Sequence, residues 1–400
     1  LVSKVWNFRY SKMASTLRSA LYPKYGTADS AMLYRYCILL HCGFKKVTKL
    51  NIEKVIELTK EVIKDCSLEN GAIVAANSDK NYYPKDANYY RYVWPRDAAY
   101  ICVAADILDI KIQEDFFQWC LERAEGFNKE GVFYQRYYTN GLKDGDQFQP
   151  DQTGSILWAI WHHYKEDLER SLEFKELVVK ASEGLCKLWN KTHFSISTYD
   201  LWEERSTFTD LLDNHTYSLA ACAKGLKCAN EIIENKKWIK NAIEMENQIE
   251  KSYDSYFLRT FGKLIDKTVD ASLLGLVYPF EIINANDKRM TDTVDAIEKK
   301  IIINGGVHRY EFDMYDGWRY YGRLRLKGAG AWPLLNFWMS IYYSIIGDKE
   351  KGKKYYQWVL DRTNGYIPEQ IFENEIQKSV SPLAWSHAMF AIASKFLEYI

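Results

Sequence analysis

Residues 330–361 read GAWPLLNFWMSIYYSIIGDKEKGKKYYQWVLD, and this stretch decides the fold class. Apolar residues recur at helical spacing on both sides of Gly347, which predicts one helix over 330–346 and another over 348–361. A connection of one residue forces two helices to be antiparallel neighbours. The stretch therefore predicts a helical hairpin.

Helical patterns of this kind occur twelve times after about residue 50, whereas strand-like alternation is weak. The connections alternate in length, because those before the even-numbered helices are long and most of the others are short. Strict alternation of this kind places every long loop at the same end of the assembly. The expected helices are 51–66, 97–108, 113–126, 151–166, 171–190, 208–229, 236–257, 270–277, 289–303, 330–346, 348–361 and 381–398. The long loops are 67–96, 127–150, 191–207, 258–269, 304–329 and 362–380.

Six hairpins with their long loops at one end suit an (α/α)6 barrel, in which an inner ring of six helices is wrapped by an outer ring of six. The alternative is an irregular helical solenoid, but the sequence shows no self-similar repeat at a fixed period. We therefore expect an all-α fold with its barrel over residues 51–400. Residues 1–50 would be an N-terminal extension or the remnant of a preceding domain.

The composition excludes several classes of protein. The 53 basic side chains equal the 53 acidic ones, so we expect no nucleic-acid partner. No apolar stretch is long enough to span a bilayer and the N-terminus lacks a signal-peptide pattern, so we expect no membrane partner and a cytoplasmic location. The eight cysteines follow no regular spacing and are expected to be reduced core residues. The start at Leu1 rather than Met is what a fragment would show.

Five of the six long loops carry clusters of Trp, Tyr, Arg and carboxylates, and this asymmetry marks the expected site. The third loop contains YDLWEER at 199–205, with Glu203 and Glu204 beside Trp202. An apolar neighbourhood raises the pKa of a carboxyl group, as a general acid at neutral pH requires. Two adjacent glutamates are also common as a solvated surface pair, so both interpretations stay open at this point.

The first and sixth loops hold further candidates. The first ends in WPRD at 94–97, where Asp97 is either a helix N-cap or, with Arg96, a grip for a polar ligand. In the second interpretation Trp94 offers a ring face for stacking. The sixth contains NGYIPEQ at 364–370, in which Glu369 on its own is an ordinary loop glutamate.

The second and fifth loops give weaker signals. Asp151 follows Gln149 and Pro150 and is also a plausible helix cap. His308 lies in GGVHRY at 305–310 and is expected to be structural or to contact a ligand, because no nucleophilic Ser or Cys motif accompanies it.

Other chemistries find little support in the sequence. No zinc-site spacing, phosphate-binding glycine loop or dinucleotide-binding glycine pattern is present, so we expect neither a metal nor an organic cofactor. Two carboxylates on separate loops, among aromatic and arginine side chains, are the equipment of a glycosidase.

Taken together, these motifs resemble the glucoamylase family, glycoside hydrolase family 15, especially its bacterial and archaeal branch. The resemblance covers roughly residues 50–400 and rests on the order and separation of short motifs. They are WPRD at 94–97, QPD at 149–151, DLWEE at 200–204, GGVHRY at 305–310, GAW at 330–332 and PEQ at 368–370. The family's fold is an (α/α)6 barrel, which agrees with the helix and loop pattern.

The resemblance implies an inverting mechanism with Glu203 as general acid and Glu369 as general base, ~6.5–9.5 Å apart to admit the attacking water. It implies an exo-acting α-glucoside hydrolase of the glucoamylase, glucodextranase or trehalase type that releases β-glucose from non-reducing ends. The partner would be an α-linked oligosaccharide or glucan. The implied contacts to it come from Trp94, Arg96, Asp97, Gln149, Asp151, Trp202, Glu204 and Arg309.

Two departures from the family and two alternatives remain. Relatives often carry a β-sandwich domain before the barrel, for which the residues before position 51 are too few; these include an amphipathic stretch over 31–44. The segment 316–327, rich in Arg and Tyr, also differs from the family pattern and leaves the subsites beyond the first undecided.

The alternatives are a catalytically impaired regulatory module and a glycoside phosphorylase, which would need a phosphate site in place of the base.

Overall fold

The computed structural model describes residues 51–315, 329–374 and 377–400. The predictions for residues 1–50, with Cys37, Cys42 and the amphipathic stretch 31–44, lie outside the described residues, as does the segment 316–327.

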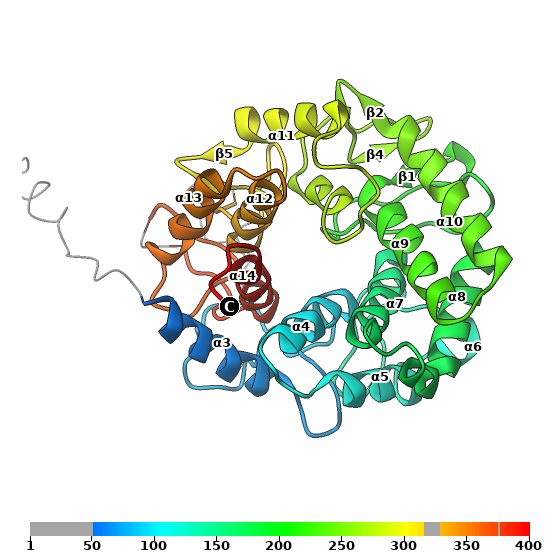
Figure 1. Cartoon of the computed structure of the whole chain (residues 1–400), viewed down its shortest axis with the longest axis horizontal. Coiled ribbons are helices and arrows are strands. Elements are labelled where there is room, and N and C mark those ends of the chain that lie inside the picture. Colours follow the sequence, from blue (N-terminus) through cyan, green and yellow to red (C-terminus); the bar gives the residue numbers. More distant parts are fainter. Residues whose placement is uncertain (1–50, 316–328, 375–376) are drawn as a thin grey trace, which may run out of the picture. The chain divides into compact units, whose positions relative to one another are not determined.

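Six helical segments form a closed inner ring (Figure 1). Each contacts the next along the chain, and the last contacts the first. They are α4 (Pro95–Ile107), α7 (Pro150–Tyr164), α9 (Thr216–Ile232), the 3-10 helix η4 (Ala271–Leu276), α12 (Pro333–Ile345) and α14 (Ala384–Phe396). Apart from their last turns these helices are buried almost all round, which is why their sequences are apolar without a polar face.

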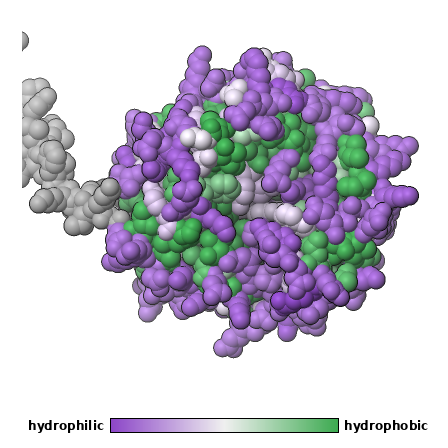
Figure 2. All heavy atoms as spheres, in the orientation of Figure 1, coloured by the Kyte–Doolittle hydropathy of each residue, from purple (hydrophilic) through white to green (hydrophobic). Residues whose placement is uncertain are grey.

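A second set of helices packs around this ring. They are α3 (Ile52–Cys66), α5 (Gln113–Glu122), α8 (Lys175–Leu188), α10 (Lys236–Ile249), α11 (Lys288–Lys300) and α13 (Lys349–Leu360). Each buries one apolar stripe and exposes a polar face, and Figure 2 shows hydrophilic residues over most of the rim that they form. The all-α (α/α)6 barrel is therefore confirmed.

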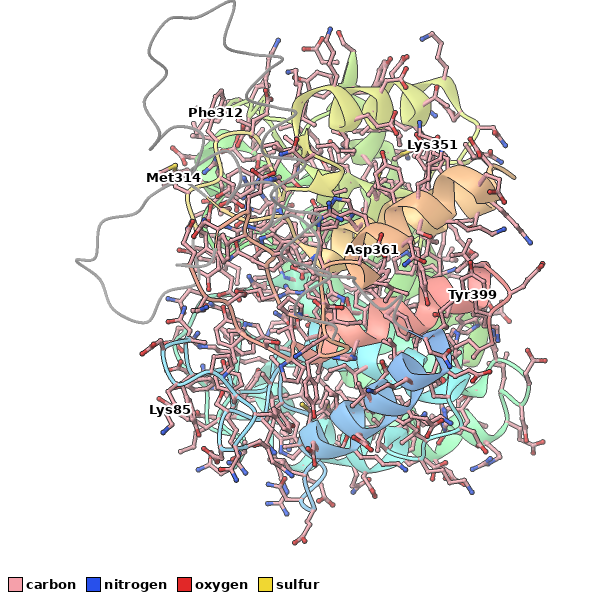
Figure 3. The ribbon with its side chains drawn as sticks, turned by 90° about the vertical axis from the view of Figure 1, so that its left-hand side faces the viewer. Lys85, Phe312, Met314, Lys351, Asp361 and Tyr399 are labelled. Carbon is pink, nitrogen blue, oxygen red and sulfur yellow. The ribbon has the colours of Figure 1, made fainter. Side chains whose placement is uncertain are left out.

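The two ends of the barrel differ, as the loop lengths predict. In Figure 3, Lys85, Phe312 and Met314, which belong to long loops, lie at one end. Lys351, near the short connection at Gly347, and Tyr399, just after α14, lie at the other. Because every inner helix follows a long loop, the N-termini of the inner helices meet at the long-loop end.

Some predicted helices were too long. The predicted helix 208–229 begins only at Thr216, the one over 236–257 ends at Ile249, and the one over 289–303 ends at Lys300. A left-handed residue lies within or directly after each misassigned part: Leu212 with φ 56°, Ser255 with φ 68° and Asn304 with φ 51°. Asn304-Gly305 is the dipeptide typical of a tight hairpin turn, and that signal was missed.

Short strands and turns occupy these positions. The strands pair antiparallel as β1 (Asn214–His215) with β4 (Thr260–Phe261), β2 (Tyr253–Asp254) with β3 (Tyr256–Phe257), and β5 (Ile302–Ile303) with β6 (Gly306–Val307). The remaining short helical segments are α6 (Phe127–Glu130), η1 (Arg170–Phe174), η2 (Thr209–Leu211) and η3 (Glu250–Ser252). The predicted helix 270–277 is 3-10 rather than α.

Large aromatic side chains fill the interior of the ring. Tyr100 of α4 lies with its ring centroid 5.1 Å from Trp158 of α7, 5.3 Å from Trp385 of α14 and 6.0 Å from Trp338 of α12. Tyr217 of α9 extends the cluster at 6.1 Å from Trp338. The barrel is therefore plugged rather than open, and the Trp- and Tyr-rich composition is largely a packing requirement.

The six described cysteines are free and buried, as expected. Within the described ranges, no helix combines the length and the apolar character needed to cross a membrane.

The contact between α7 and α9 depends on two glycines. A Cβ atom at Gly225 would lie 2.8 Å from the Cα of Gly154, and one at Gly154 would meet the backbone of Ala221. We expect Gly225→Ala to lower the free energy of unfolding by about 1–3 kcal/mol, because the two helices cannot separate without disturbing the ring. Urea denaturation would measure it. Gly347→Asn is the control, since an added Cβ there would meet no atom of the described residues within 4 Å and Asn tolerates a left-handed φ. Equal stability losses in both variants would contradict the packing argument.

Candidate active site

Glu203 occupies a strained backbone position at the long-loop end. Its φ is 63°, in the left-handed region that side-chain-bearing residues rarely adopt. Its Oε1 accepts a hydrogen bond from Trp94 Nε1 at 2.6 Å, and its Oε2 accepts one from Gln135 Nε2. Burial raises the pKa of Glu203, although Arg96 and the hydrogen bond from Trp94 oppose the rise. The interpretation of residues 203 and 204 as a solvated surface pair does not fit this setting for Glu203.

Asp200 holds the turn that carries Glu203. Its Oδ1 accepts hydrogen bonds from the backbone N–H of Glu204 at 2.8 Å and of Arg205 at 2.9 Å. Its Oδ2 accepts one from Arg259 Nε at 3.1 Å. Although burial alone would raise the pKa of Asp200, Arg259 keeps it below its usual value, so Asp200 remains ionised and the turn remains fixed.

Glu369 is the second carboxyl group of the site and, unlike the partly buried Glu203, is only 2% exposed. Its Oε1 accepts a hydrogen bond from the Tyr90 hydroxyl at 2.9 Å, whereas Oε2 has no hydrogen-bond partner in the described part of the chain. Burial raises the pKa of Glu369 to about 7, against the opposing effects of Tyr90 and Arg309. One oxygen is therefore fixed and the other is left to accept a proton.

The two carboxyl groups are connected through an aromatic pair. Tyr90, which binds Glu369, lies with its ring centroid 5.3 Å from that of Trp94, which binds Glu203. Arg309 interacts with both the third and the sixth loop. It binds Glu204 Oε1 at 2.8 Å, and its charge lowers the pKa of Glu369. These contacts place the third and sixth loops around one region.

Arg96 and Asp97 lie in the first turn of α4. The helix begins behind Trp94 without a side-chain cap, so the interpretation of Asp97 as an N-cap is wrong. Arg96 pairs with Asp151 at 3.0 Å and with Asp97 Oδ1 at 3.3 Å. Arg96 Nε is buried and has no hydrogen-bond partner among the described residues. Burial raises the pKa of Asp97 to about 7, although the charge of Arg96 opposes the rise. A buried polar atom without a partner is suited to a hydroxyl of a ligand.

Gln149 and Asp151 are fully buried among protein groups. Gln149 is itself the N-cap of α7, so Asp151 lies in the first turn rather than at the cap that the sequence suggested. Gln149 Nε2 donates to the carbonyl of Asp200 at 2.7 Å, and Asp151 Oδ1 accepts from Ser218 at 3.2 Å in addition to its contact with Arg96.

Trp202, Glu204 and Arg309 form a second connected cluster in the region. The guanidinium of Arg309 lies 5.3 Å from the ring centroid of Trp202, and it also pairs with Asp313 at 2.7 Å. Glu204 accepts hydrogen bonds from Arg309 and from the Tyr310 hydroxyl. Trp202 is buried, with Nε1 3.0 Å from Asp270 Oδ2.

Several residues of the site escaped the sequence analysis. Gln135 lies in the second loop outside any motif, and only its position on a long loop pointed to it. The fourth loop, which carried no cluster of motif residues, contributes Arg259, and Asp270 follows that loop; the two pair at 3.2 Å beneath Asp200 and Trp202. The available sequence signal was an Arg near the start of an otherwise plain loop and an Asp directly after its end.

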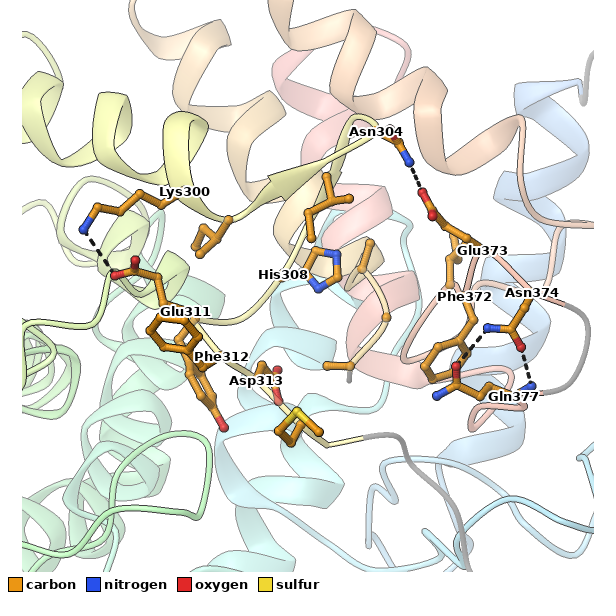
Figure 4. A pocket seen from close by; sticks show the side chains of 18 of the residues that line it. Lys300, Asn304, His308, Glu311, Phe312, Asp313, Phe372, Glu373, Asn374 and Gln377 are labelled. Atoms are coloured by element: carbon orange, nitrogen blue, oxygen red, sulfur yellow. Dashed lines mark hydrogen bonds and ion pairs between the residues drawn. The ribbon is translucent and has the colours of Figure 1, made fainter. Parts of the chain in front are cut away.

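A cavity of about 950 Å³ opens beside this region (Figure 4). His308 lies in its middle, between the Lys300–Glu311 pair and the Asn304–Glu373 pair. Asp313, the partner of Arg309, also lines it, whereas Glu203 and Glu369 do not. Burial lowers the pKa of His308, so this side chain is neutral in the cavity wall at neutral pH.

No group of three or more His, Cys, Asp or Glu side chains that could hold a metal ion occurs in the described part of the chain.

Comparison with known proteins decides the family. The family model described as glycosyl hydrolases family 15 matches residues 110–395. The chain belongs to glycosyl hydrolase family 15.

Relatives within this family differ in name and in length. An uncharacterised glycosyl hydrolase of Methanocaldococcus jannaschii is 32% identical over 371 residues, which cover 85% of this chain and 55% of that protein. The isomaltose glucohydrolase of Kribbella flavida is 23% identical, with 77% of this chain and 85% of that protein covered. A trehalase of Thermoplasma volcanium is 26% identical, with 71% and 48% covered. The chain thus spans about half the length of the first and third of these relatives.

Solved structures share the fold of this family 15 member. A glycosidase solved in complex with glucose superposes with a TM-score of 0.71 at 21% identity, covering 94% of this chain and all of that one. A bacterial glucoamylase complexed with acarbose gives a TM-score of 0.68 at 20% identity, covering 88% of this chain and 57% of that one. At these identities the likeness establishes the barrel architecture alone.

The raised pKa of Glu369 predicts a pH-dependent stability effect. The pKa rises from 4.5 to about 7 on folding, so the folded state binds an extra proton between these pH values. The stabilisation is complete below pH 4.5 and is lost as the pH rises through about 7. Because the amide of Glu369→Gln cannot ionise, the variant should be more stable than the wild type above pH 7 by up to about 3 kcal/mol, with the difference disappearing near pH 4.

Chemical denaturation at a series of pH values would measure this difference. Glu61→Gln, at an exposed glutamate of α3, is the control and should leave the pH profile of stability unchanged. A stability difference between Glu369→Gln and wild type that is the same at pH 4 and pH 8 would contradict the burial argument.

Proposed function

We propose that this chain is an inverting, exo-acting α-glucoside hydrolase that releases β-glucose from non-reducing ends. The observation that carries the proposal is a pair of carboxyl groups with raised pKa values, the partly buried Glu203 and the buried Glu369, linked through Trp94 and Tyr90. Glu369 keeps an oxygen without a hydrogen-bond partner among the described residues. Two carboxyl groups, one acid and one base, are what glycoside hydrolysis requires.

Glu203 is proposed as the general acid. A raised pKa keeps a larger fraction of the carboxyl group protonated at neutral pH, so that it can protonate the departing glycosidic oxygen. The hydrogen bonds from Trp94 and Gln135 fix the orientation of the carboxyl plane. Protonation of the leaving oxygen lets the anomeric carbon develop oxocarbenium character as the bond breaks.

Glu369 is proposed as the general base. Its Oε2 would take a proton from a water molecule as the water oxygen attacks the anomeric carbon from the face opposite the leaving group. A base with a pKa near 7 is stronger than an ordinary carboxylate and suits this task. The separation of ~6.5–9.5 Å between the two carboxyl groups, needed for that water, stays a prediction.

The terminal sugar is proposed to bind above the aromatic plug. Arg96 lies with its guanidinium 5.2 Å from the ring centroid of Trp385, so the plug closes the region beneath Arg96 and Asp97. A closed floor favours a chain end over a chain middle, which supports exo action. Arg96 and Asp97 would hold hydroxyl groups of this sugar.

The remaining predicted residues take two roles in this proposal. Trp94, Trp202, Glu204 and Arg309 would line the substrate region. Gln149 and Asp151, being fully buried and bonded to protein groups, would instead hold the Asp200 turn and Arg96 in place.

The names of the relatives support an α-linked glucose substrate, with isomaltose and trehalose as specific candidates beside α-1,4 glucans. A cytoplasmic location stays a prediction.

The proposal is tested by incubating the protein with maltose, isomaltose and trehalose and following the released sugar by NMR. We expect β-glucose as the first product from at least one of them, because water attacks opposite the α-bond, and we expect no dependence on phosphate. Release of α-glucose would contradict inversion, and glucose 1-phosphate formed only with phosphate would identify a phosphorylase. Binding without turnover of any of the three would favour the regulatory alternative.

Amide variants separate the roles of the two glutamates. Glu203→Gln should lose far more activity on natural disaccharides than on glucosides with good leaving groups, about 100-fold or more, because only poor leaving groups need protonation. Glu369→Gln should lose activity by at least about 100-fold on both kinds of substrate, because both need the attacking water. Steady-state kinetics on maltose and on an α-glucosyl fluoride would measure this. Equal losses of Glu203→Gln on the two substrates would contradict its role as acid.

A further inference from the structure

His387 connects the sixth long loop to two helices of the barrel. It is fully buried in the first turn of α14, and its Nδ1 lies 2.8 Å from the Thr59 hydroxyl of α3. On the other side of the ring, its Nε2 accepts a hydrogen bond from the backbone N–H of Ile367 at 2.9 Å. Ile367 precedes the proposed base, Glu369, by two positions. None of these contacts has a role in the proposed mechanism.

The contact with Ile367 decides the protonation state of the imidazole ring. A backbone N–H can only donate, so Nε2 of His387 must be without a proton. The single proton of the neutral ring is then on Nδ1, where the Thr59 hydroxyl oxygen accepts it. Burial lowers the pKa of His387 to about 3, so the ring is neutral at neutral pH, as this arrangement requires.

The start of α14 binds every backbone polar group of the two residues before the proposed base. The Ile367 N–H donates to His387, and the Ile367 carbonyl accepts from the N–H of Leu383 at 2.9 Å. Pro368 has no N–H, and its carbonyl accepts from the Ser386 hydroxyl at 2.9 Å. The backbone that leads to the base is therefore fixed to a helix of the inner ring, and two of its three bonds come from side chains.

We propose that His387, together with Ser386 beside it, is a positioning residue for the base: by binding the backbone of Ile367 and Pro368 these side chains set the direction of the Glu369 carboxyl group. This inference rests on the proposed function, because it assigns a task relative to the proposed base. A buried N–H left without an acceptor is costly, so without His387 the loop would shift toward another partner. A displacement of a reacting group by about 1 Å can lower a rate about 100-fold.

Two amide variants separate the bond to Ile367 from the bond to Thr59. The amide oxygen of His387→Gln reaches about as far as Nε2 and can still accept the Ile367 N–H, whereas the shorter side chain of His387→Asn reaches only as far as Nδ1. We expect kcat of His387→Asn to fall about 10- to 100-fold with KM nearly unchanged, because the base is displaced. We expect kcat of His387→Gln to stay near the wild-type value. Steady-state kinetics on the disaccharide that the wild type hydrolyses fastest would measure both.

Thr59→Val is the matched control for these variants. It removes the hydroxyl on the other side of the same imidazole at similar volume, and it should lower the melting temperature because Nδ1 loses its buried partner. It should nevertheless leave kcat near the wild-type value, since Nε2 still accepts the Ile367 N–H. A merely structural role of His387 predicts that kcat follows the melting temperature across all three variants, and that result would overturn the inference.

A comparison of two substrates identifies which group is displaced. A displaced base slows the attack of water on every substrate, so His387→Asn should lose the same factor on the disaccharide and on α-glucosyl fluoride. A loss confined to the disaccharide would place the defect at the proposed acid and would overturn the inference.

Ser386 provides a test that does not depend on the folding of the His387 variants. Ser386→Ala removes the donor to the Pro368 carbonyl and changes the side-chain volume little. Ser394→Ala is its control, because Ser394 is equally buried in the same helix and its hydroxyl bonds to Phe390 and Tyr356, which lie outside the sixth loop. We expect kcat to fall several-fold in Ser386→Ala, on both substrates, and to stay unchanged in Ser394→Ala. Equal kcat values in the two variants would overturn the inference.

The outcomes separate this inference from the proposed function. A wild type without activity on any α-glucoside overturns the proposed function and, with it, the inference. An active wild type whose kcat is retained in both His387→Asn and Ser386→Ala overturns the inference alone.

Discussion

The structure depends on the inner helices all beginning at one end of the barrel. Three of them, α4, α7 and α12, start with a proline at the first helical position, preceded by Trp94, Gln149 and Trp332 in extended conformation. None of these three residues caps its helix with its side chain, where Ser, Thr, Asp or Asn would stabilise the helix by about 1 kcal/mol. The side chains of Trp94 and Gln149 instead hold the loop that carries Glu203.

Convergent helix starts also explain why so many charges are buried there. The N-terminal turn of a helix has free N–H groups and a positive dipole end, which favour carboxylates. Asp97, Asp151 and Asp270 lie at or within one turn of such starts, and Arg96 and Arg259 pair with them. The pairing is incomplete, because Asp97 and Glu369 keep raised pKa values and Glu369 Oε2 has no hydrogen-bond partner in the described part of the chain. Conformational stability is therefore reduced where a ligand would supply the missing partners.

The sequence predicted the ring because loop length and helical periodicity are local properties. The single residue Gly347 between two apolar patterns was enough to define one hairpin, and alternation along the chain defined the others. It also pointed to a raised pKa at Glu203 from its apolar neighbours, whereas Glu369 was singled out only by the family resemblance. It failed where the outcome depends on distant pairs: Arg259 acquires its importance from Asp200, which lies 59 positions away. Asp97 was ambiguous for the same reason, since only its place beside Arg96 and Asp151 distinguishes it from a cap.

Arg309 shows how the two halves of the site depend on one another. Its guanidinium binds Glu204, which follows the proposed acid directly, and also Asp313, whose carboxylate accepts the backbone N–H of Tyr315. Arg309 thereby anchors the third loop, which carries the proposed acid. It also anchors the fifth loop, whose Tyr315 contacts Tyr90, the hydrogen-bond donor to the proposed base. An ion pair buried among aromatic rings is costly to rearrange, because breaking it leaves a charge without a partner. The positions of the proposed acid and the proposed base, 166 positions apart in the sequence, are therefore coupled through Arg309.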